Sequence, residues 1–206
     1  MEDIICGTLN ETSREFTNKV HDKIAIPEIY RNLGWTVDNT DPEELEKIDL
    51  NDGIDYILLD RNGRKINVQE RFREYRYHEY NDATLRYERE HNLIAERQKS
   101  EFYKIKADYL VYGIINASKW QILKDIKQGT FVKYAVIDVA VLREKIDSGL
   151  IIPDYSVRIP FISDGKMHAA VNENKDDSSS FIAFDVEGLN QLFGSDNIIL
   201  TQKGYY

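Results

Sequence analysis

The sequence predicts one α/β domain with a central sheet and flanking helices. Near the N-terminus an apolar residue recurs every four positions, as on one face of a helix. Short β-prone runs bounded by turn residues follow in the middle and the C-terminal part. With 206 residues, of which 42% are hydrophobic, the chain is long enough to bury one sizeable core.

The first helix is predicted from its capping pattern. Residues 12–15 place a hydroxyl three positions before a glutamate, the pairing that satisfies the first free amides of a helix. The apolar stripe that follows consists of Phe16, Val20 and Ile24. Pro27 is expected to end this helix and to start a second short one, which Gly34 ends.

The central hairpin is predicted from its turn chemistry. Before it, residues 35–37 indicate a very short strand and 41–46 an exposed helix. Asp60-Arg61-Asn62-Gly63 is typical of a hairpin turn, and it joins a strand over 54–59 to a returning strand over 65–72.

The remaining elements follow in order. Residues 82–87 fit a short strand or the start of a helix, and 88–100 a loop or an exposed helix. Buried strands are expected over 105–115 and 131–139, before a helix over 140–147. The last part is expected to contain strands over 157–162, 167–171 and 180–186, a polar loop over 172–179 and a helix around 189–193.

The formal net charge of -9 argues against a protein that coats nucleic acid nonspecifically. The middle of the chain differs, because residues 61–106 carry 12 Lys or Arg against 8 Asp or Glu, with aromatic residues interleaved. This mixture suits nucleic-acid binding through Arg71, Arg73, Arg76 and Tyr75. It equally suits an exposed strand whose aromatic side chains cover the core while its arginines pair with glutamates.

Several classes of protein are not expected. No apolar run approaches the roughly 18 residues that span a bilayer, and the N-terminus lacks a secretory signal. The lone Cys6 fits a reducing, cytoplasmic compartment. The histidines lack zinc-ligand spacing, and neither a phosphate-binding glycine loop nor a Gly-x-Ser-x-Gly motif occurs.

The central hairpin can bring polar groups together. Alternate side chains of a strand share a face, so Gln69 and Arg71 point one way while Glu70 and Phe72 point the other. Asp55 can lie near the first pair across the hairpin. A carboxylate, an amide oxygen and a guanidinium at one point could hold a hard divalent cation beside a phosphate.

These residues resemble a known family. Gly53-Ile54-Asp55 followed by Val68-Gln69-Glu70-Arg71 is similar to the paired motif of the PD-(D/E)XK nuclease superfamily, and Lys106-Ala107-Asp108-Tyr109 to its later strand. The superfamily core runs helix, strand, strand with Asp, strand with Glu-x-Lys, helix, strand. The resemblance implies a restriction endonuclease-like core over about 13–140, followed by a β-rich extension over about 151–206.

The resemblance implies a metal-dependent endonuclease that hydrolyses the phosphodiester bonds of DNA with Mg²⁺ or Mn²⁺. Asp55 takes the position of the metal-binding Asp, Gln69 that of the Glu, and Arg71 that of the Lys. A carboxylate on the first helix often joins such sites, and of Asp22 and Glu28 we prefer Glu28. A homodimer that cuts two strands is compatible with this expectation.

The motif also departs from the family. Gln69 is neutral, and Arg71 cannot lose its proton and act as a base. A one-residue bulge would turn Glu70 inward and restore a carboxylate to a metal-binding set of Asp55, Gln69 and Glu70. One alternative is a catalytically inactive nuclease-fold module that binds nucleic acid or a protein. Another is a purely structural hairpin, in which Asp55 pairs locally and Arg71 forms a salt bridge.

Overall fold

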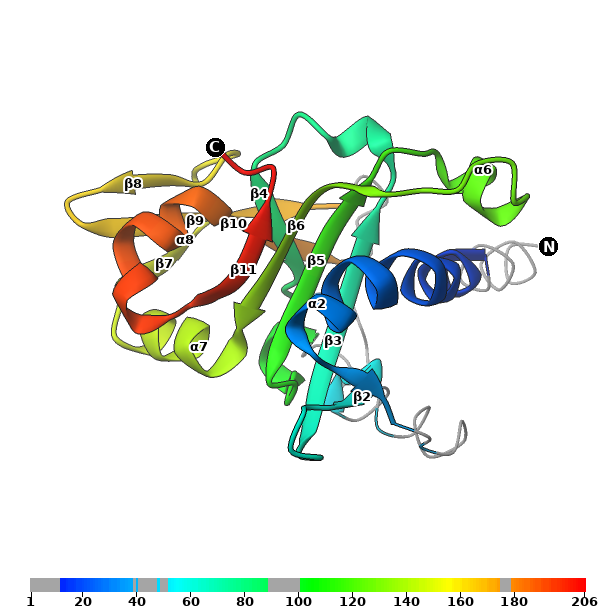
Figure 1. Ribbon diagram of the computed structural model, residues 1–206. Helices are drawn as coiled ribbons and strands as arrows, with labels where there is room; N and C mark the ends of the chain where they lie inside the picture. The colour runs from blue at the N-terminus through cyan, green and yellow to red at the C-terminus, as the bar shows by residue number, and fades with distance from the viewer. Residues whose placement is uncertain (1–11, 39, 41–47, 49–51, 89–100, 175–178) are drawn as a thin grey trace.

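The computed structural model describes residues 12–38, 40, 48, 52–88, 101–174 and 179–206, and it shows two mixed β-sheets with several helices (Figure 1). The α/β class predicted from the sequence is confirmed. No helix in the described residues is long and apolar enough to cross a membrane.

The strands are β1 (Thr36–Val37), β2 (Tyr56–Leu59), β3 (Lys65–Arg73), β4 (Asp82–Arg86), β5 (Tyr109–Ile115), β6 (Phe131–Asp138), β7 (Ile151–Asp154), β8 (Phe161–Ser163), β9 (Lys166–Glu173), β10 (Ser180–Asp185) and β11 (Ile199–Lys203). The helices are η1 (His21–Tyr30), α2 (Arg31–Leu33), η2 (Tyr75–Tyr77), α5 (Glu101–Lys104), α6 (Lys119–Leu123), α7 (Val139–Asp147), α8 (Val186–Phe193) and η3 (Gly194–Asp196).

The two sheets have different origins in the chain. The first has the strand order β1-β2-β3-β5-β6-β11, and the second has β4-β10-β9-β7 with β8 paired to β9. The pairs β3–β5 and β7–β9 are parallel, whereas all other pairs are antiparallel. The C-terminal segment therefore supplies most of the second sheet and also the last strand of the first.

Two apolar clusters cover the two faces of the first sheet. The N-terminal helix packs on one face, where Ile24 and Ile29 meet Val68 and Val111. The second sheet packs behind the other face, as Figure 1 shows. Strands β3 and β5 are thus buried on both sides, which suits parallel neighbours.

The N-terminal helix does not break at Pro27. Residues 12–20 are α-helical, η1 is a π-helix, and α2 continues it to Gly34, so the predicted division into two helices is wrong. In η1 the hydrogen bonds span five residues, as between the Arg31 amide and the Ile26 carbonyl. This wider turn accommodates the proline ring that disrupts a regular α-helix.

The β2–β3 hairpin forms as predicted. The Asp60 carboxylate accepts hydrogen bonds from the amides of Asn62 (2.8 Å) and Arg64 (2.9 Å), and Gly63 adopts φ 76°. This turn chemistry fixes the register, in which Tyr56 is opposite Val68. The strand positions immediately before Tyr56 and after Val68 are therefore neighbours.

The other predicted elements were confirmed only in part. Residues 82–86 form a strand, which decides between the two alternatives for that stretch, whereas α6, β7 and β11 were not predicted. The predicted helix over 41–46 and nearly all of 88–100 lie outside the described residues, as does half of the 172–179 loop.

The space between the sheets also holds polar atoms. Buried side-chain oxygens of Asp82, Thr84, Tyr112 and Tyr205 have no hydrogen-bond partner in the described part of the chain. Burial raises the pKa of the Asp82 carboxyl, and the nearby Arg73 guanidinium only partly opposes this effect. A charge at Asp82 is therefore unfavourable in the folded protein.

We expect the Asp82→Asn variant to gain stability relative to the wild type as pH rises. The folded pKa of Asp82 is above its ordinary value of 3.8. Its contribution to stability is therefore complete below 3.8 and is lost as pH rises through the folded pKa. Denaturant unfolding of both proteins between about pH 3 and about pH 7 measures this difference. A difference in unfolding free energy that stays constant over this range would contradict the raised pKa.

Candidate functional site

Asp55 lies immediately before β2 and is held by the neighbouring strand. Its amide donates to the Val68 carbonyl (2.9 Å). Its Oδ2 atom accepts hydrogen bonds from Gln69 Nε2 (2.7 Å) and from the Glu70 amide (2.6 Å). The hairpin thus brings the Asp55 carboxylate and the Gln69 side chain into direct contact, as both the nuclease and the structural interpretations require.

Gln69 is buried with one atom of its amide unpaired. Its Oε1 atom has no hydrogen-bond partner among the described residues. Gly53, at φ 62°, lies directly against it, because a Cβ added to Gly53 would be 3.3 Å from Oε1 and 3.4 Å from the Ile105 Cα. A buried amide oxygen without a partner costs free energy, so a ligand that supplied a donor or a cation to this atom would stabilise the folded chain.

Arg71 follows on the same face of β3. In the regular pairing of β3 with β5, Gln69 is opposite Leu110 and Arg71 is opposite Tyr112, and both partners pack between the two sheets. Burial raises the pKa of Tyr112 to about 12, while the Arg73 and Arg71 guanidinium groups act to lower it. Arg71 thus places a positive charge on the face that Asp55 and Gln69 share.

Glu70 points to the opposite face, toward the N-terminal helix. Its fully buried carboxylate accepts hydrogen bonds at Oε1 from the Tyr30 hydroxyl and from His21 Nδ1 (2.7 Å). The Oε2 atom has no partner in the described residues. The register of β3 with β2 and β5 is regular, so the bulge that would turn Glu70 toward Gln69 is not formed.

An aromatic side chain closes the Glu70 cluster. The Tyr56 ring stacks on His21 with 3.5 Å between ring centroids, and its hydroxyl donates to Asn18 Oδ1 (3.0 Å). Burial raises the pKa of Tyr56, and the charges of Glu70, Asp22 and Asp55 raise it further. Negative charge from three carboxylates is therefore concentrated around this ring.

Asp22, a carboxylate of the N-terminal helix, is one of the three whose charge acts on Tyr56. The Glu28 carboxylate instead accepts from the Phe131 amide (3.3 Å) and lies 3.7 Å from Lys203 Nζ. These partners belong to β6 and β11, which β3 and β5 separate from β2. The structure thus places the preferred Glu28 away from Asp55, whereas the alternative Asp22 influences Tyr56, the neighbour of Asp55 in sequence.

The arginine and tyrosine stripe is partly engaged within the protein. The Arg73 guanidinium lies over the rings of Tyr77 (4.6 Å) and Tyr112 (5.9 Å). Arg76 forms an ion pair with Glu74 (2.7 Å), although 70% of its side chain is exposed. Tyr75 is 46% exposed and stacks on His78. Arg76 and Tyr75 therefore remain accessible to a ligand, while Arg73 has a packing role.

Sequence reasoning missed His21 and Tyr30 as partners of Glu70. His21 lies three residues before Ile24 and is buried on the same helix as Ile24 and Tyr30. A histidine in a buried stripe requires a polar partner, and this signal could have indicated a buried acid on the strand beneath it.

We expect Tyr30→Phe to lower the free energy of unfolding by about 1–3 kcal/mol, because it removes a donor from a buried carboxylate. Tyr205→Phe is a matched control, since Tyr205 is also buried and its hydroxyl has no hydrogen-bond partner among the described residues. Denaturant unfolding of both variants measures the difference. Equal losses would show that the Tyr30 hydroxyl contributes no specific stabilisation.

Comparison of the chain with protein-family models, with curated proteins and with solved structures finds no match. The proposals below therefore rest on the residues and geometry of this chain.

Proposed function

We propose that the chain is a metal-dependent endonuclease with a restriction endonuclease-like core, acting on the phosphodiester bonds of DNA. The contact between Asp55 and Gln69 carries this proposal, because it joins a carboxylate to a side chain with a buried, unpaired amide oxygen among the described residues. Arg71 adds a positive charge on the same face of β3.

The strand order supports the core that the resemblance implies. A helix is followed by three strands, β1, β2 and β3, which pair antiparallel in sequence order. The next strand of the same sheet, β5, is parallel to β3. Asp55 precedes the second of these strands and Gln69 lies within the third, where the superfamily carries its Asp and its Glu.

The protein would supply only two oxygen donors to a magnesium ion at this site. No group of three His, Cys, Asp or Glu residues in the described ranges could hold a metal. Mg²⁺, however, is often bound by one or two carboxylates together with substrate phosphates and waters. Asp55 and the Gln69 amide oxygen would hold it, which requires the Gln69 amide to turn its Oε1 atom, in place of Nε2, toward Asp55. A bound ion would polarise the phosphate and activate a water.

Arg71 would act as an electrostatic group. Its guanidinium stays protonated and presents a planar set of donors to phosphate oxygens. Charge that develops on the scissile phosphate is therefore stabilised, while deprotonation of the attacking water depends on other groups.

The first test combines cleavage with metal binding. We expect wild-type protein to cut supercoiled plasmid only with Mg²⁺ or Mn²⁺, and Asp55→Ala to lose more than about 100-fold of this rate while remaining folded. Loss of residues that merely support a metal ligand already costs about 10- to 100-fold. Persistent cutting by Asp55→Ala would exclude the assignment.

Gln69→Glu provides a test that does not depend on cleavage. Two adjacent carboxylates repel, so this variant should be less stable than wild type without metal and should regain stability as Mn²⁺ is added. Gln202→Glu is the matched control, because Gln202 Oε1 is also buried without a partner among the described residues. Thermal unfolding with and without Mn²⁺ should show rescue of the first variant alone.

A second candidate is a catalytically silent module of the same fold that binds nucleic acid. One observation favours it: Gln69 offers Asp55 an amide N–H donor, and Glu70 is occupied by His21 and Tyr30. Among the described residues, Asp55 is then the carboxylate that remains to bind a metal.

For the silent module, Arg71→Ala and Arg76→Ala should each weaken DNA binding and lower the slope of log affinity against log salt by about 1. Arg61→Ala, in the exposed hairpin turn, should leave both quantities unchanged. Fluorescence anisotropy with labelled duplex at several salt concentrations measures them, and an unaltered slope in all three variants would reject this surface.

A further inference from the structure

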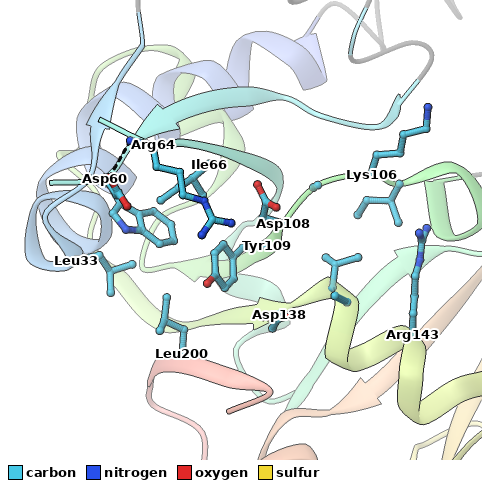
Figure 2. Close-up of a pocket in the computed structure, with 15 residues that line it drawn as sticks. Leu33, Asp60, Arg64, Ile66, Lys106, Asp108, Tyr109, Asp138, Arg143 and Leu200 are labelled. Atoms are coloured by element: carbon cyan, nitrogen blue, oxygen red, sulfur yellow. Dashed lines mark hydrogen bonds between the residues drawn. The ribbon is translucent and has the colours of Figure 1, made fainter. Parts of the chain in front are cut away.

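A pocket opens at the end of the first sheet where β3 and β5 begin and β6 ends. Its volume is about 700 Å³, which is within the range of small-molecule sites. Figure 2 shows side chains from the β2–β3 turn, from the start of β5 and from α7 around it. Asp55 and Gln69 do not line it, although Ile105, which does, packs against Gly53 beside Gln69.

One wall of the pocket is aromatic and apolar. It contains Leu33, Trp35, Tyr109 and Leu200. The Trp35 and Tyr109 rings lie 5.2 Å apart at 37°, so Trp35 supports the half-buried Tyr109 ring from behind. Such a supported ring offers a flat surface on which a planar heterocycle can stack.

The positive charge available in this pocket comes from Arg64. Two other cations line it, but Lys106 pairs with Asp52 (2.7 Å) and Arg143 donates to the Phe102 carbonyl (3.3 Å). The exposed Arg64 guanidinium forms no hydrogen bond or ion pair with the described residues, and Figure 2 shows it extending toward Tyr109. A guanidinium in this state suits a phosphate or carboxylate group.

Three carboxylates of the described residues line the pocket, of which Asp60 accepts hydrogen bonds from the amides of its own turn. Asp108 accepts from the Asn67 amide (2.7 Å) and Asp138 from the Val141 amide (2.9 Å), each through one oxygen. Burial raises the pKa of Tyr109, and the Asp138 and Asp108 charges raise it further, so both lie close to this ring. Their second oxygens can accept hydrogen bonds from N–H groups at the edge of a stacked ring.

We propose that this pocket binds a nucleotide, with its base on Tyr109, its phosphate on Arg64 and the amino edge of the base toward Asp108 and Asp138. A nucleotide satisfies the aromatic surface, the unpaired cation and the free carboxylate oxygens together. A simple organic cation would leave the Arg64 guanidinium without an anionic partner. An aromatic acid without amino groups would leave the second oxygens of Asp108 and Asp138 desolvated without a further donor.

The same chemistry exists in a free nucleotide and in the terminal unit of a nucleic acid chain. The inference goes beyond the proposed cleavage at Asp55, because nucleotide binding requires neither Asp55 nor a metal. The two proposals can therefore fail separately. Asp55→Ala should bind nucleotide like the wild type whether or not the protein cleaves DNA.

Tryptophan fluorescence measures binding directly. The chain has two tryptophans, so the Trp120→Phe background leaves Trp35, in the pocket wall, as the only reporter. The probes are adenosine 5′-monophosphate, adenosine, inorganic phosphate and a short single-stranded oligonucleotide with a 5′-phosphate. We expect saturable change with the monophosphate, and at least about tenfold weaker binding of adenosine and of phosphate, since a charged hydrogen-bond pair contributes about 1.5–3 kcal/mol.

Two variants locate the ligand. Arg64→Gln should weaken monophosphate binding about tenfold and leave adenosine unaffected, whereas Arg61→Gln in the same turn should change neither. Tyr109→Leu should weaken both ligands. Tighter binding of the oligonucleotide supports a nucleic-acid end as occupant, and equal or weaker binding supports a free nucleotide. Absence of a saturable signal, or full affinity in Arg64→Gln, would overturn the proposal.

Discussion

Strand β3 is the constraint on which both faces of the first sheet depend. From Ile66 to Phe72 its side chains alternate between two sides, toward the N-terminal helix and toward the second sheet. The turn at Asp60 fixes its register against β2. A slip of one residue would exchange Gln69 and Glu70 between these environments and would leave a buried carboxylate without donors.

Gln69 and Glu70 lie on opposite faces of β3 and make different contacts. Glu70 receives donors from His21 and Tyr30 and so ties the helix to the sheet through buried polar contacts. Gln69 meets Asp55 and keeps an unpaired oxygen in the described part of the chain. A buried charge with well-placed donors is tolerated for structure, whereas an unpaired acceptor beside a carboxylate is the feature from which we propose a ligand.

The sequence predicted those features that depend on interactions between neighbouring residues, such as turns and helix ends. The hairpin followed from the turn residues 60–63, and Gly34 ends the helical region as expected, although of one continuous helix and not of a second short one. The predicted helix break at Pro27 was wrong. A π-helix accommodates the proline ring, and nothing in the neighbouring residues predicts it. The Asp55–Gln69 contact was predictable, since register alone produces it.

Contacts between residues that are distant in the chain could not be predicted from the sequence. The choice between Asp22 and Glu28 depends on which face of the helix meets which strand, and periodicity does not decide this. The Arg64 and Tyr109 pocket likewise joins a turn, a strand start and a helix that are distant in sequence.

The pairing of distant segments also has a consequence for how the chain folds during synthesis. Strand β4 needs β10 as its neighbour, and β6 needs β11 at the edge of the first sheet. Neither sheet can be completed until the last strands have left the ribosome, so β4 and β6 present open edges until β10 and β11 emerge. Such long-range pairing slows folding, and it makes the whole chain cooperative instead of letting its N-terminal part mature alone.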